Sequence, residues 1–278
     1  MKLLFFCTRW GQEHQPWNDF CKKVKNAGYD GVETALPLDN EERVHILSAL
    51  AKYDLELIAV QWDTGTADFT AYAKEYELRL RSAATANPLF ITSHTGKDFF
   101  SFEQNEQLLN LAQKIGDEKG VKIVHETHRG KFSFAAHITR AYLEKLPWLK
   151  LTLDISHWFA VAESYLADQA GAVDLALAHT DHIHARIGYV NGPQVNDPRA
   201  PEWEDVVQKH LLLWDKVLDM HKNNGREQLT FTTEFGPFPY MQLLPYTEIP
   251  VVSQFKINEY MLNLLKKRYN LPYNFDQL

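Results

Sequence analysis

Seven residues recur at nearly equal intervals along this chain of 278 residues, each at or near the end of a short apolar run. The intervals are 28 to 32 residues, followed by one of 50. One βα unit takes about 30 residues and a whole (β/α)8 barrel about 250. The repeat therefore predicts an α/β fold, a (β/α)8 TIM barrel, whose C-terminal mouth carries the chemistry. The recurring residues are Glu33, Trp62, His94, Glu126, Asp154, His184 and Glu234.

Strand and helix signals alternate from one end of the chain to the other, which indicates parallel βαβ units. A doubly wound open sheet is the structural rival, but the Gly-rich phosphate turn after its first strand is absent here. No linker divides the chain, so we expect a single domain over residues 1–278. The expected strands are 3–7, 31–35, 55–62, 88–94, 121–126, 149–154, 181–186 and 229–234. The expected helices are 17–27, 40–53, 68–86, 101–119, 133–146, 164–178, 202–223 and 252–268.

One long irregular stretch, residues 187–201, accounts for the longest interval. A loop of this length on a compact domain is usually a lid or a binding loop, and a variable surface loop is the alternative. On the predicted helices or at their ends lie His179, His210 and His221, which we expect to face solvent.

The composition restricts the partners. The net charge is −7, and the densest basic cluster is Lys266-Lys267-Arg268, so a nucleic-acid enzyme is disfavoured. An acidic surface favours a small neutral or cation-bridged substrate. The two cysteines form no CxxC pair, and no apolar run approaches the ~20 residues of a membrane span. The run of residues 3–7 is too short for the core of an export signal, so we expect a cytoplasmic enzyme.

Strand parity places charged side chains inside the barrel. Because side chains alternate along a strand, Asp154, His184 and Glu234 point inward. His182 shares the inward face and is the rival of His184 as a ligand, although His184 lies nearer the strand end. Buried carboxylates need a cation, either a metal ion or nearby Arg and Lys side chains. With Glu126, the set suits Mn²⁺ or Mg²⁺, with Co²⁺ and Zn²⁺ as alternatives.

At these positions the chain resembles the xylose isomerase-like barrels, and more closely the sugar phosphate isomerase/epimerase superfamily that includes ketose 3-epimerases. The resemblance spans most of the chain and is sharpest from residue 121 onward. It implies one divalent metal bound by Glu126, Asp154, His184 and Glu234, with Glu126 and Glu234 also acting as the acid/base pair. It also implies that His157 touches the substrate. The segments that carry it are His125-Glu126-Thr127-His128, Leu153-Asp154-Ile155-Ser156-His157, His182-Ile183-His184-Ala185-Arg186 and Thr233-Glu234-Phe235-Gly236.

The chain departs from several members of that superfamily just after Glu126. Those members carry another acidic residue there, whereas this chain has Thr127, His128, Arg129 and Gly130. The identity of the sugar is therefore open. Homodimers and homotetramers are common among the relatives.

The predicted function is that of a metal-dependent isomerase or epimerase of carbohydrate metabolism, acting on a ketose or related sugar by proton transfer through an enediolate. A metal-dependent lyase or dehydratase on a polyol or keto-sugar would share the same metal site. A non-catalytic sugar-binding barrel is a further alternative. A DNA-repair nuclease on this fold is disfavoured by the acidic charge. The candidate substrate contacts are His157, Arg186, His94, Trp62, His128, Glu33 and Trp10, and a salt bridge within the mouth explains Glu33 equally well.

Overall fold

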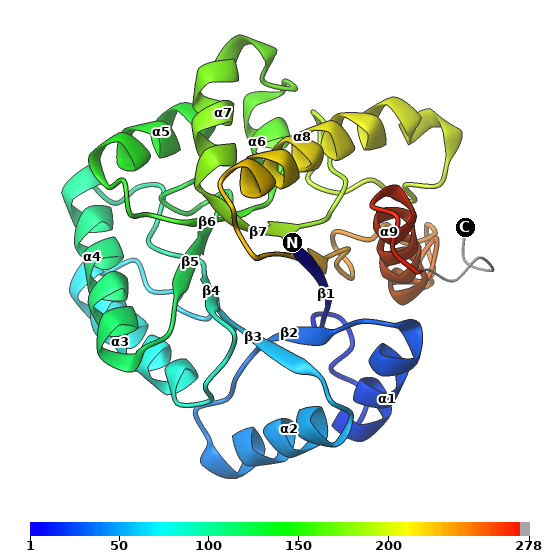
Figure 1. The fold of residues 1–278 in the computed structure, drawn as a ribbon, viewed down its shortest axis with the longest axis horizontal. Coiled ribbons are helices and arrows are strands. Elements are labelled where there is room, and N and C mark those ends of the chain that lie inside the picture. Colours follow the sequence, from blue (N-terminus) through cyan, green and yellow to red (C-terminus); the bar gives the residue numbers. More distant parts are fainter. Residues whose placement is uncertain (273–278) are drawn as a thin grey trace.

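Parallel strands close into a barrel in sequence order, and β1 completes the ring by pairing with β8 (Figure 1). The computed structural model describes residues 1–272, so the last six residues of the expected domain lie outside it. Its strands are Lys2–Thr8 (β1), Gly31–Ala35 (β2), Glu56–Gln61 (β3), Ile91–Ser93 (β4), Ile123–Glu126 (β5), Leu151–Leu153 (β6), Thr180–His184 (β7) and Gln228–Thr233 (β8). The predicted (β/α)8 barrel is confirmed.

Helices form a ring outside these strands (Figure 1). They are Trp17–Ala27 (α1), Asn40–Lys52 (α2), Phe69–Ala84 (α3), Phe102–Lys119 (α4), Ala136–Lys145 (α5), Ile155–Ala162 (α6), Ala170–His179 (α7), Glu204–Asn223 (α8) and Gln254–Arg268 (α9). Two short 3₁₀ helices, Ala167–Gln169 (η1) and Pro201–Trp203 (η2), precede α7 and α8. None of the helices in residues 1–272 is both long and apolar enough to cross a membrane.

The barrel interior is filled by large apolar side chains below the mouth. Leu4 and Phe6 of β1, Ile58 of β3 and Val124 of β5 form one buried cluster there, together with Phe90. The opposite faces of the strands pack against the helices in two larger clusters. Because this apolar cluster fills the interior, polar side chains can converge at the C-terminal ends of the strands.

The helix expected near residues 164–178 corresponds to α7, which begins later, at Ala170. The structure has a further helix that was not predicted, α6, which begins directly after Asp154. Between them Glu163 and Leu166 adopt left-handed backbone conformations with φ of 48° and 62°, which ends the first helix. Residues 155–159 of α6 are all buried, so this helix has too little polar surface to produce an amphipathic pattern.

The expectation that His210 and His221 face solvent is also wrong. His210 is fully buried, and its Nε2 accepts a hydrogen bond from the backbone N–H of Gly188 at 3.3 Å. His221 is buried with its Nε2 2.7 Å from the carbonyl oxygen of Thr180. Backbone groups bond both ring nitrogens of His210 and the Nε2 of His221, while His221 Nδ1 has no partner among the described residues. Both rings pack as core residues of α8.

The irregular residues 187–200 pack onto the barrel. Val195 is fully buried. The Gln194 side chain forms two hydrogen bonds with the backbone of Gly236, accepting from its N–H at 2.7 Å and donating to its carbonyl at 3.2 Å. The long loop is thereby fixed to the segment that follows β8.

Candidate functional site

A cavity of about 560 Å³ opens at the C-terminal ends of the strands. Its volume is within the range of small-molecule sites. No residue of the loop 187–200 lines it in the described part of the chain, so the expected lid is not seen over this cavity. Eight of the residues singled out from the sequence line it: Trp10, Glu33, Trp62, His94, Glu126, His128, Arg186 and Glu234.

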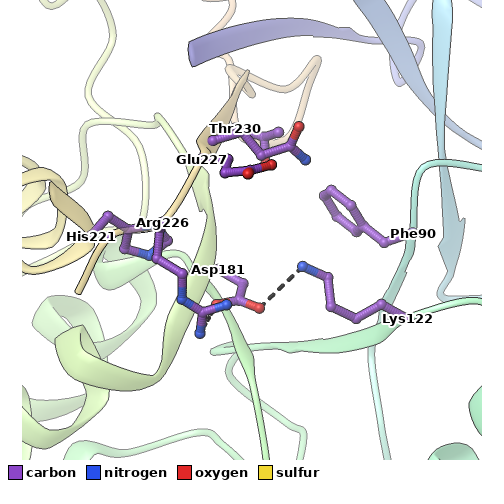
Figure 2. A pocket seen from close by; sticks show the side chains of 9 residues that line it. Phe90, Lys122, Asp181, His221, Arg226, Glu227 and Thr230 are labelled. Carbon is purple, nitrogen blue, oxygen red and sulfur yellow. Dashed lines mark hydrogen bonds and ion pairs between the residues drawn. The ribbon is translucent and has the colours of Figure 1, made fainter. Parts of the chain in front are cut away.

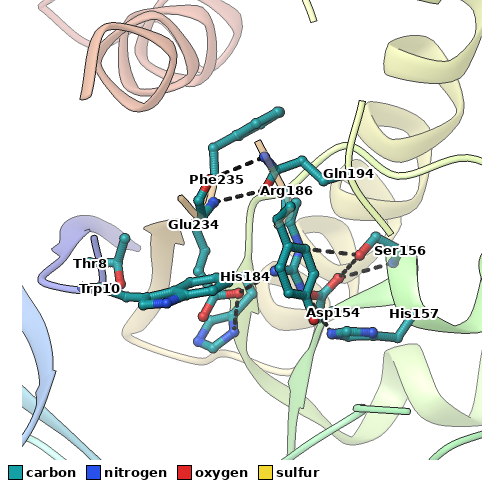
Figure 3. Close-up of polar contacts among 12 residues, drawn as sticks. Thr8, Trp10, Asp154, Ser156, His157, His184, Arg186, Gln194, Glu234 and Phe235 are labelled. Carbon is teal, nitrogen blue, oxygen red and sulfur yellow. Dashed lines mark hydrogen bonds and ion pairs between the residues drawn. The ribbon is translucent and has the colours of Figure 1, made fainter. Parts of the chain in front are cut away.

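The structure brings Glu126, Asp154, His184 and Glu234 together. One donor atom from each lies within 4.8 Å of the other three. Glu126 and His184 are the last residues of β5 and β7, and Asp154 and Glu234 directly follow β6 and β8. Figure 3 shows Asp154, His184 and Glu234 converging from their strands. Glu126 and Glu234 line the cavity, whereas Asp154 and His184 are fully buried behind it.

Within residues 1–272, three buried atoms of this group have no hydrogen-bond partner: His184 Nδ1, Glu126 Oε2 and Glu234 Oε2. His184 Nδ1 and Glu234 Oε2 lie 3.0 Å apart but are not aligned as a hydrogen bond. His184 Nδ1 is also 3.5 Å from Glu126 Oε1. Buried polar atoms without partners are costly, and a cation among them would remove the cost. The donor set, one imidazole and three carboxylates, therefore fits a divalent metal ion.

Glu33 binds the other side of the His184 ring. His184 Nε2 lies 3.1 Å from both carboxylate oxygens of Glu33. Donation of the Nε2 hydrogen to Glu33 leaves the Nδ1 lone pair directed toward the carboxylates, which is a common arrangement for metal-binding histidines. Burial opposes ionisation of Glu33, but His184 and His182 lower its pKa, so Glu33 is a carboxylate at neutral pH.

His182 lies outside the four-residue set. Its Nδ1 is 2.7 Å from Thr230 Oγ1, and its Nε2 is 3.3 Å from Glu33 Oε2. Glu33, His182 and His184 form a separate group of close donor atoms. Burial lowers the pKa of His184, but Glu234, Glu33 and Glu126 outweigh it and raise that pKa well above the usual value. Without a metal ion, a proton on this ring supplies part of the missing positive charge.

Arg186 supplies the alternative countercharge that the sequence left open. Its guanidinium contacts Asp154 Oδ2 directly and lies 3.7 Å from Glu234 Oε2 (Figure 3). Burial raises the pKa of Asp154 to about 6, because the charges of Glu234 and Glu126 add to the effect of burial and Arg186 only partly offsets it. One arginine therefore does not neutralise three converging carboxylates.

Three further histidines adjoin Glu126. His94 Nε2 contacts Glu126 Oε2. The ring of His128 contacts those of His94 and His157 in tilted arrangements, with centroid distances of 4.8 Å to His94 and 3.9 Å to His157. Burial lowers the pKa of His128 to about 3, so its ring is neutral. His157, on α6, is fully buried and contacts Arg186 at 2.7 Å; it does not line the cavity.

Aromatic rings form the outer part of the cavity. Trp10 packs against the backbone of Gly236, where any side chain would collide because a Cβ would lie 2.2 Å from the indole. Tyr240 contacts Trp10 edge-on and lies over the Arg186 guanidinium at 4.9 Å. Trp62 is half exposed at the rim. Trp10 and Trp62 thus present aromatic ring surface to a ligand in the cavity.

Sequence reasoning missed Tyr240, Arg9 and Lys131, which also line the cavity. Tyr240 lies in an irregular segment after β8, and Lys131 lies in the loop after β5. Neither follows a strand directly, so the strand-end spacing gives no signal for them. Arg9 directly follows β1 and could have been found from that position.

The opposite end of the barrel carries a smaller cavity of about 290 Å³. Figure 2 shows Lys122 and Asp181 facing each other across it, 3.1 Å apart. Arg226 lies 3.6 Å from the other oxygen of Asp181. Asp181 is thus paired with two cations of the protein, as expected for the face of a TIM barrel that contributes to stability.

Comparison with known proteins agrees with this architecture. The sequence profile of the xylose isomerase-like TIM barrels matches residues 21–197, and the chain belongs to that family. No curated protein sequence matches the chain significantly.

Solved structures share the fold at low sequence identity. The 3-keto-D-glucoside 4-epimerase of E. coli superposes with a TM-score of 0.63 at 14% identity, covering 96% of this chain and all (100%) of that one. The D-psicose 3-epimerase of Clostridium cellulolyticum gives 0.60 at 14% identity, covering 96% and 98%. The probable 3-DHS dehydratase of Bacillus anthracis gives 0.59 at 15% identity, covering 95% and 99%.

Proposed function

We propose that this protein is a divalent-metal-dependent isomerase or epimerase that acts on a ketose or a related sugar. The observation that carries the proposal is the convergence of Glu126, Asp154, His184 and Glu234 within 4.8 Å at the floor of a 560 Å³ cavity. These four residues would hold one ion, with Mn²⁺ or Mg²⁺ favoured by the oxygen-rich donor set. When bound, such an ion polarises a carbonyl group and stabilises the negative charge that develops on deprotonation beside it.

Glu126 and Glu234 are the proposed acid/base pair. Both line the cavity, and they come from β5 and β8, three strands apart around the barrel. Burial opposes ionisation of Glu126, but His94 and His184 hold its pKa well below the usual value, so it is a base at neutral pH. One glutamate removes the proton next to the carbonyl group. Return of a proton by the other gives the epimer, and return to the neighbouring carbon gives the isomer.

Side chains around the pair can orient a sugar. His94, His128 and Arg186 offer polar atoms at the cavity wall, and Trp10 and Trp62 offer aromatic faces. His157 would act indirectly, because it contacts Arg186 and is shielded from the cavity. Few polar groups on a largely apolar and aromatic wall are typical of sites for small molecules. The shared fold of two sugar epimerases supports the same assignment.

Metal content tests the first half of the proposal. Elemental analysis of protein purified without chelator is expected to give about one divalent ion per chain, and Asp154→Ala is expected to lose it. Protein that lacks metal and does not take up Mn²⁺, Co²⁺ or Zn²⁺ would contradict the proposal. A non-catalytic sugar-binding barrel would then be the better description.

Deuterium exchange tests the second half. Ketoses incubated with metal-loaded protein in D₂O are expected to gain deuterium next to the carbonyl group. Glu126→Gln or Glu234→Gln should abolish this exchange, and each variant should remain folded without metal. Glu227→Gln, the same change at the opposite end of the barrel, is the matched control. Full activity of both cavity variants would exclude the mechanism. Loss of water from the product would identify a dehydratase, which the same four residues could support.

A further inference from the structure

Lys131 is a largely buried lysine whose ammonium group has no partner among the described residues. Its side chain lines the mouth cavity, yet the residue is only 8% exposed. Within residues 1–272 its ammonium group has no ion pair within 4.0 Å and no hydrogen bond. Lysine is almost never buried unless it is paired. An unpaired ammonium group on a largely buried side chain at a cavity wall therefore indicates a negative group that arrives with a ligand.

The loop that carries Lys131 is fixed. The backbone N–H of Lys131 bonds to the carbonyl of His128 at 3.2 Å, and that of Phe132 bonds to the carbonyl of Thr95 at 3.2 Å. Ser133 Oγ also donates to the carbonyl of Glu126. These bonds tie the loop to β5 and to the loop after β4. Lys131 is thus held at the cavity by its backbone and does not reach it by chance from a mobile surface.

The protein does not fully compensate the charge of Lys131. Burial and, to a smaller extent, repulsion from Lys97 lower the pKa of Lys131 to about 8, and the charges of Glu126 and Asp98 offset this only in part. Lys97 likewise forms no ion pair among the described residues. The neighbouring imidazole of His128 is neutral, so it adds no charge beside the lysines. A group with one or two negative charges would remove the cost of this arrangement.

We propose that Lys131, with Lys97 nearby, binds a carboxylate or phosphate group of the substrate, which is then a sugar acid or a sugar phosphate. This proposal rests on the proposed function and specifies its substrate class. The net charge of the whole chain favoured a neutral or cation-bridged substrate, and this proposal sets aside the neutral one, because the local field of a cavity governs what binds inside it. Glu126 and Lys131 line the same cavity, so one molecule can place its reacting carbons at the glutamates and its charged group at the lysine.

Matched ligand pairs test the proposal by isothermal titration calorimetry on the Mn²⁺-loaded protein and again on metal-free protein. The pairs are fructose 6-phosphate against fructose, and gluconate against sorbitol. Sugar anions also chelate metal ions, so the metal-free arm isolates the contribution of the lysine. The charged member of at least one pair is expected to bind about tenfold or more tightly than its neutral partner. The phosphate pair and the carboxylate pair distinguish the two sources of charge.

Lys131→Met should remove this preference and leave the affinity for the neutral member unchanged. Lys131→Arg should retain part of it. Lys114→Met, which removes an exposed lysine of α4, should retain all of it and is the matched control. Circular dichroism checks that each variant is folded.

Three results would overturn the proposal: equal affinities within both pairs, a preference that survives in Lys131→Met, or no binding of either charged ligand at millimolar concentration. Failure of the proposed function would look different. In that case metal uptake or deuterium exchange is missing, whereas the preference for the charged ligand persists in the metal-free arm.

Discussion

At the scale of single residues, Glu33 is the neighbour that determines how His184 can act. Its carboxylate lies 3.1 Å from His184 Nε2 and leaves Nδ1 facing the other carboxylates. Glu33→Gln replaces an ionised acceptor with a neutral amide, so we expect Mn²⁺ affinity to fall about 10- to 100-fold with the fold intact. Titration with Mn²⁺ measures this. Glu13→Gln, the same change elsewhere on the cavity wall, should have no such effect, and an unchanged affinity in Glu33→Gln would show that Glu33 is only packed there.

The charge of Lys131, which we propose to bind the substrate, should lower the free energy of unfolding of the ligand-free protein. The pKa of Lys131 is about 8 in the folded protein and about 10.4 in an unfolded chain. Its charge therefore opposes folding below pH 8, and the penalty disappears as the pH rises from 8 to 10.5. We expect Lys131→Met to raise the free energy of unfolding by about 1–3 kcal/mol at pH 7, and the gain to shrink toward pH 10. Urea unfolding at both pH values measures it. A Lys131→Met protein less stable than wild type at pH 7 would contradict this account.

At the scale of secondary-structure elements, Thr127 joins the end of β5 to the turn between β6 and α6. Its hydroxyl donates to the carbonyl of Asp154 at 2.9 Å and accepts from the N–H of Asp154 at 2.8 Å. Thr127→Val keeps the shape but leaves both backbone groups buried without this partner. We expect a loss of about 1–3 kcal/mol in unfolding free energy and weaker Mn²⁺ binding.

Thr139→Val separates these two effects. Thr139 is buried in α5, and among residues 1–272 its hydroxyl bonds only to the carbonyl of Ala135. This variant should lose some stability without a change in Mn²⁺ affinity. If Thr127→Val binds Mn²⁺ as tightly as wild type does, the bond to Asp154 does not position the carboxylate.

Strand positions could be predicted from the sequence because their signals are local. The two-residue period of β7 correctly places His182 and His184 on one inward face, and the repeat places Glu126 and Glu234 at strand ends. Helix α6 could not be predicted, because burial around most of its surface removes the helical period.

Contacts between distant segments were also beyond the sequence. Glu33 meets His182 and His184, which lie 149 and 151 residues further along the chain. Tyr240 reaches Arg186 from a segment with no strand or helix. His210 is buried because it lies on the face of α8 that packs inward. The helical pattern of apolar residues assigns polar side chains to the solvent face, so it gives the wrong position for this histidine.

At the scale of the whole molecule, the two ends of the barrel treat charge differently. At the N-terminal end Asp181 is paired with Lys122 and Arg226. At the mouth, Arg186 faces the carboxylates of Asp154, Glu126 and Glu234, and the pKa of Asp154 rises to about 6 as a result of burial and their repulsion. The barrel thus keeps its unbalanced charge at the end where the cavity opens.

This imbalance predicts how metal-free protein responds to pH. The pKa of Asp154 is about 6 in the folded protein and about 3.9 when unfolded, so protonation of Asp154 favours the folded state. Its contribution to stability is complete below about pH 4 and is lost as the pH rises through 6. We expect Asp154→Asn to stabilise metal-free protein at pH 7 and to have little effect at pH 4. Urea unfolding of both proteins at both pH values checks this, and equal stabilisation at the two pH values would exclude titration of Asp154 as the cause.

A bound metal ion should compensate the excess negative charge at the mouth and so stabilise the whole folded protein. A ligand that binds only the folded state at 100 times its Kd adds about 2.7 kcal/mol to stability. For a chain of this size the corresponding rise in Tm is about 5–10 °C. We expect excess Mn²⁺ to raise the Tm of wild type by this amount, EDTA to reverse it, and Asp154→Ala to show no shift. Differential scanning calorimetry measures all three. An ion that binds the folded state must stabilise it. If the Tm of wild type does not rise either, no ion binds, and Arg186 and the proton on His184 already balance the carboxylates.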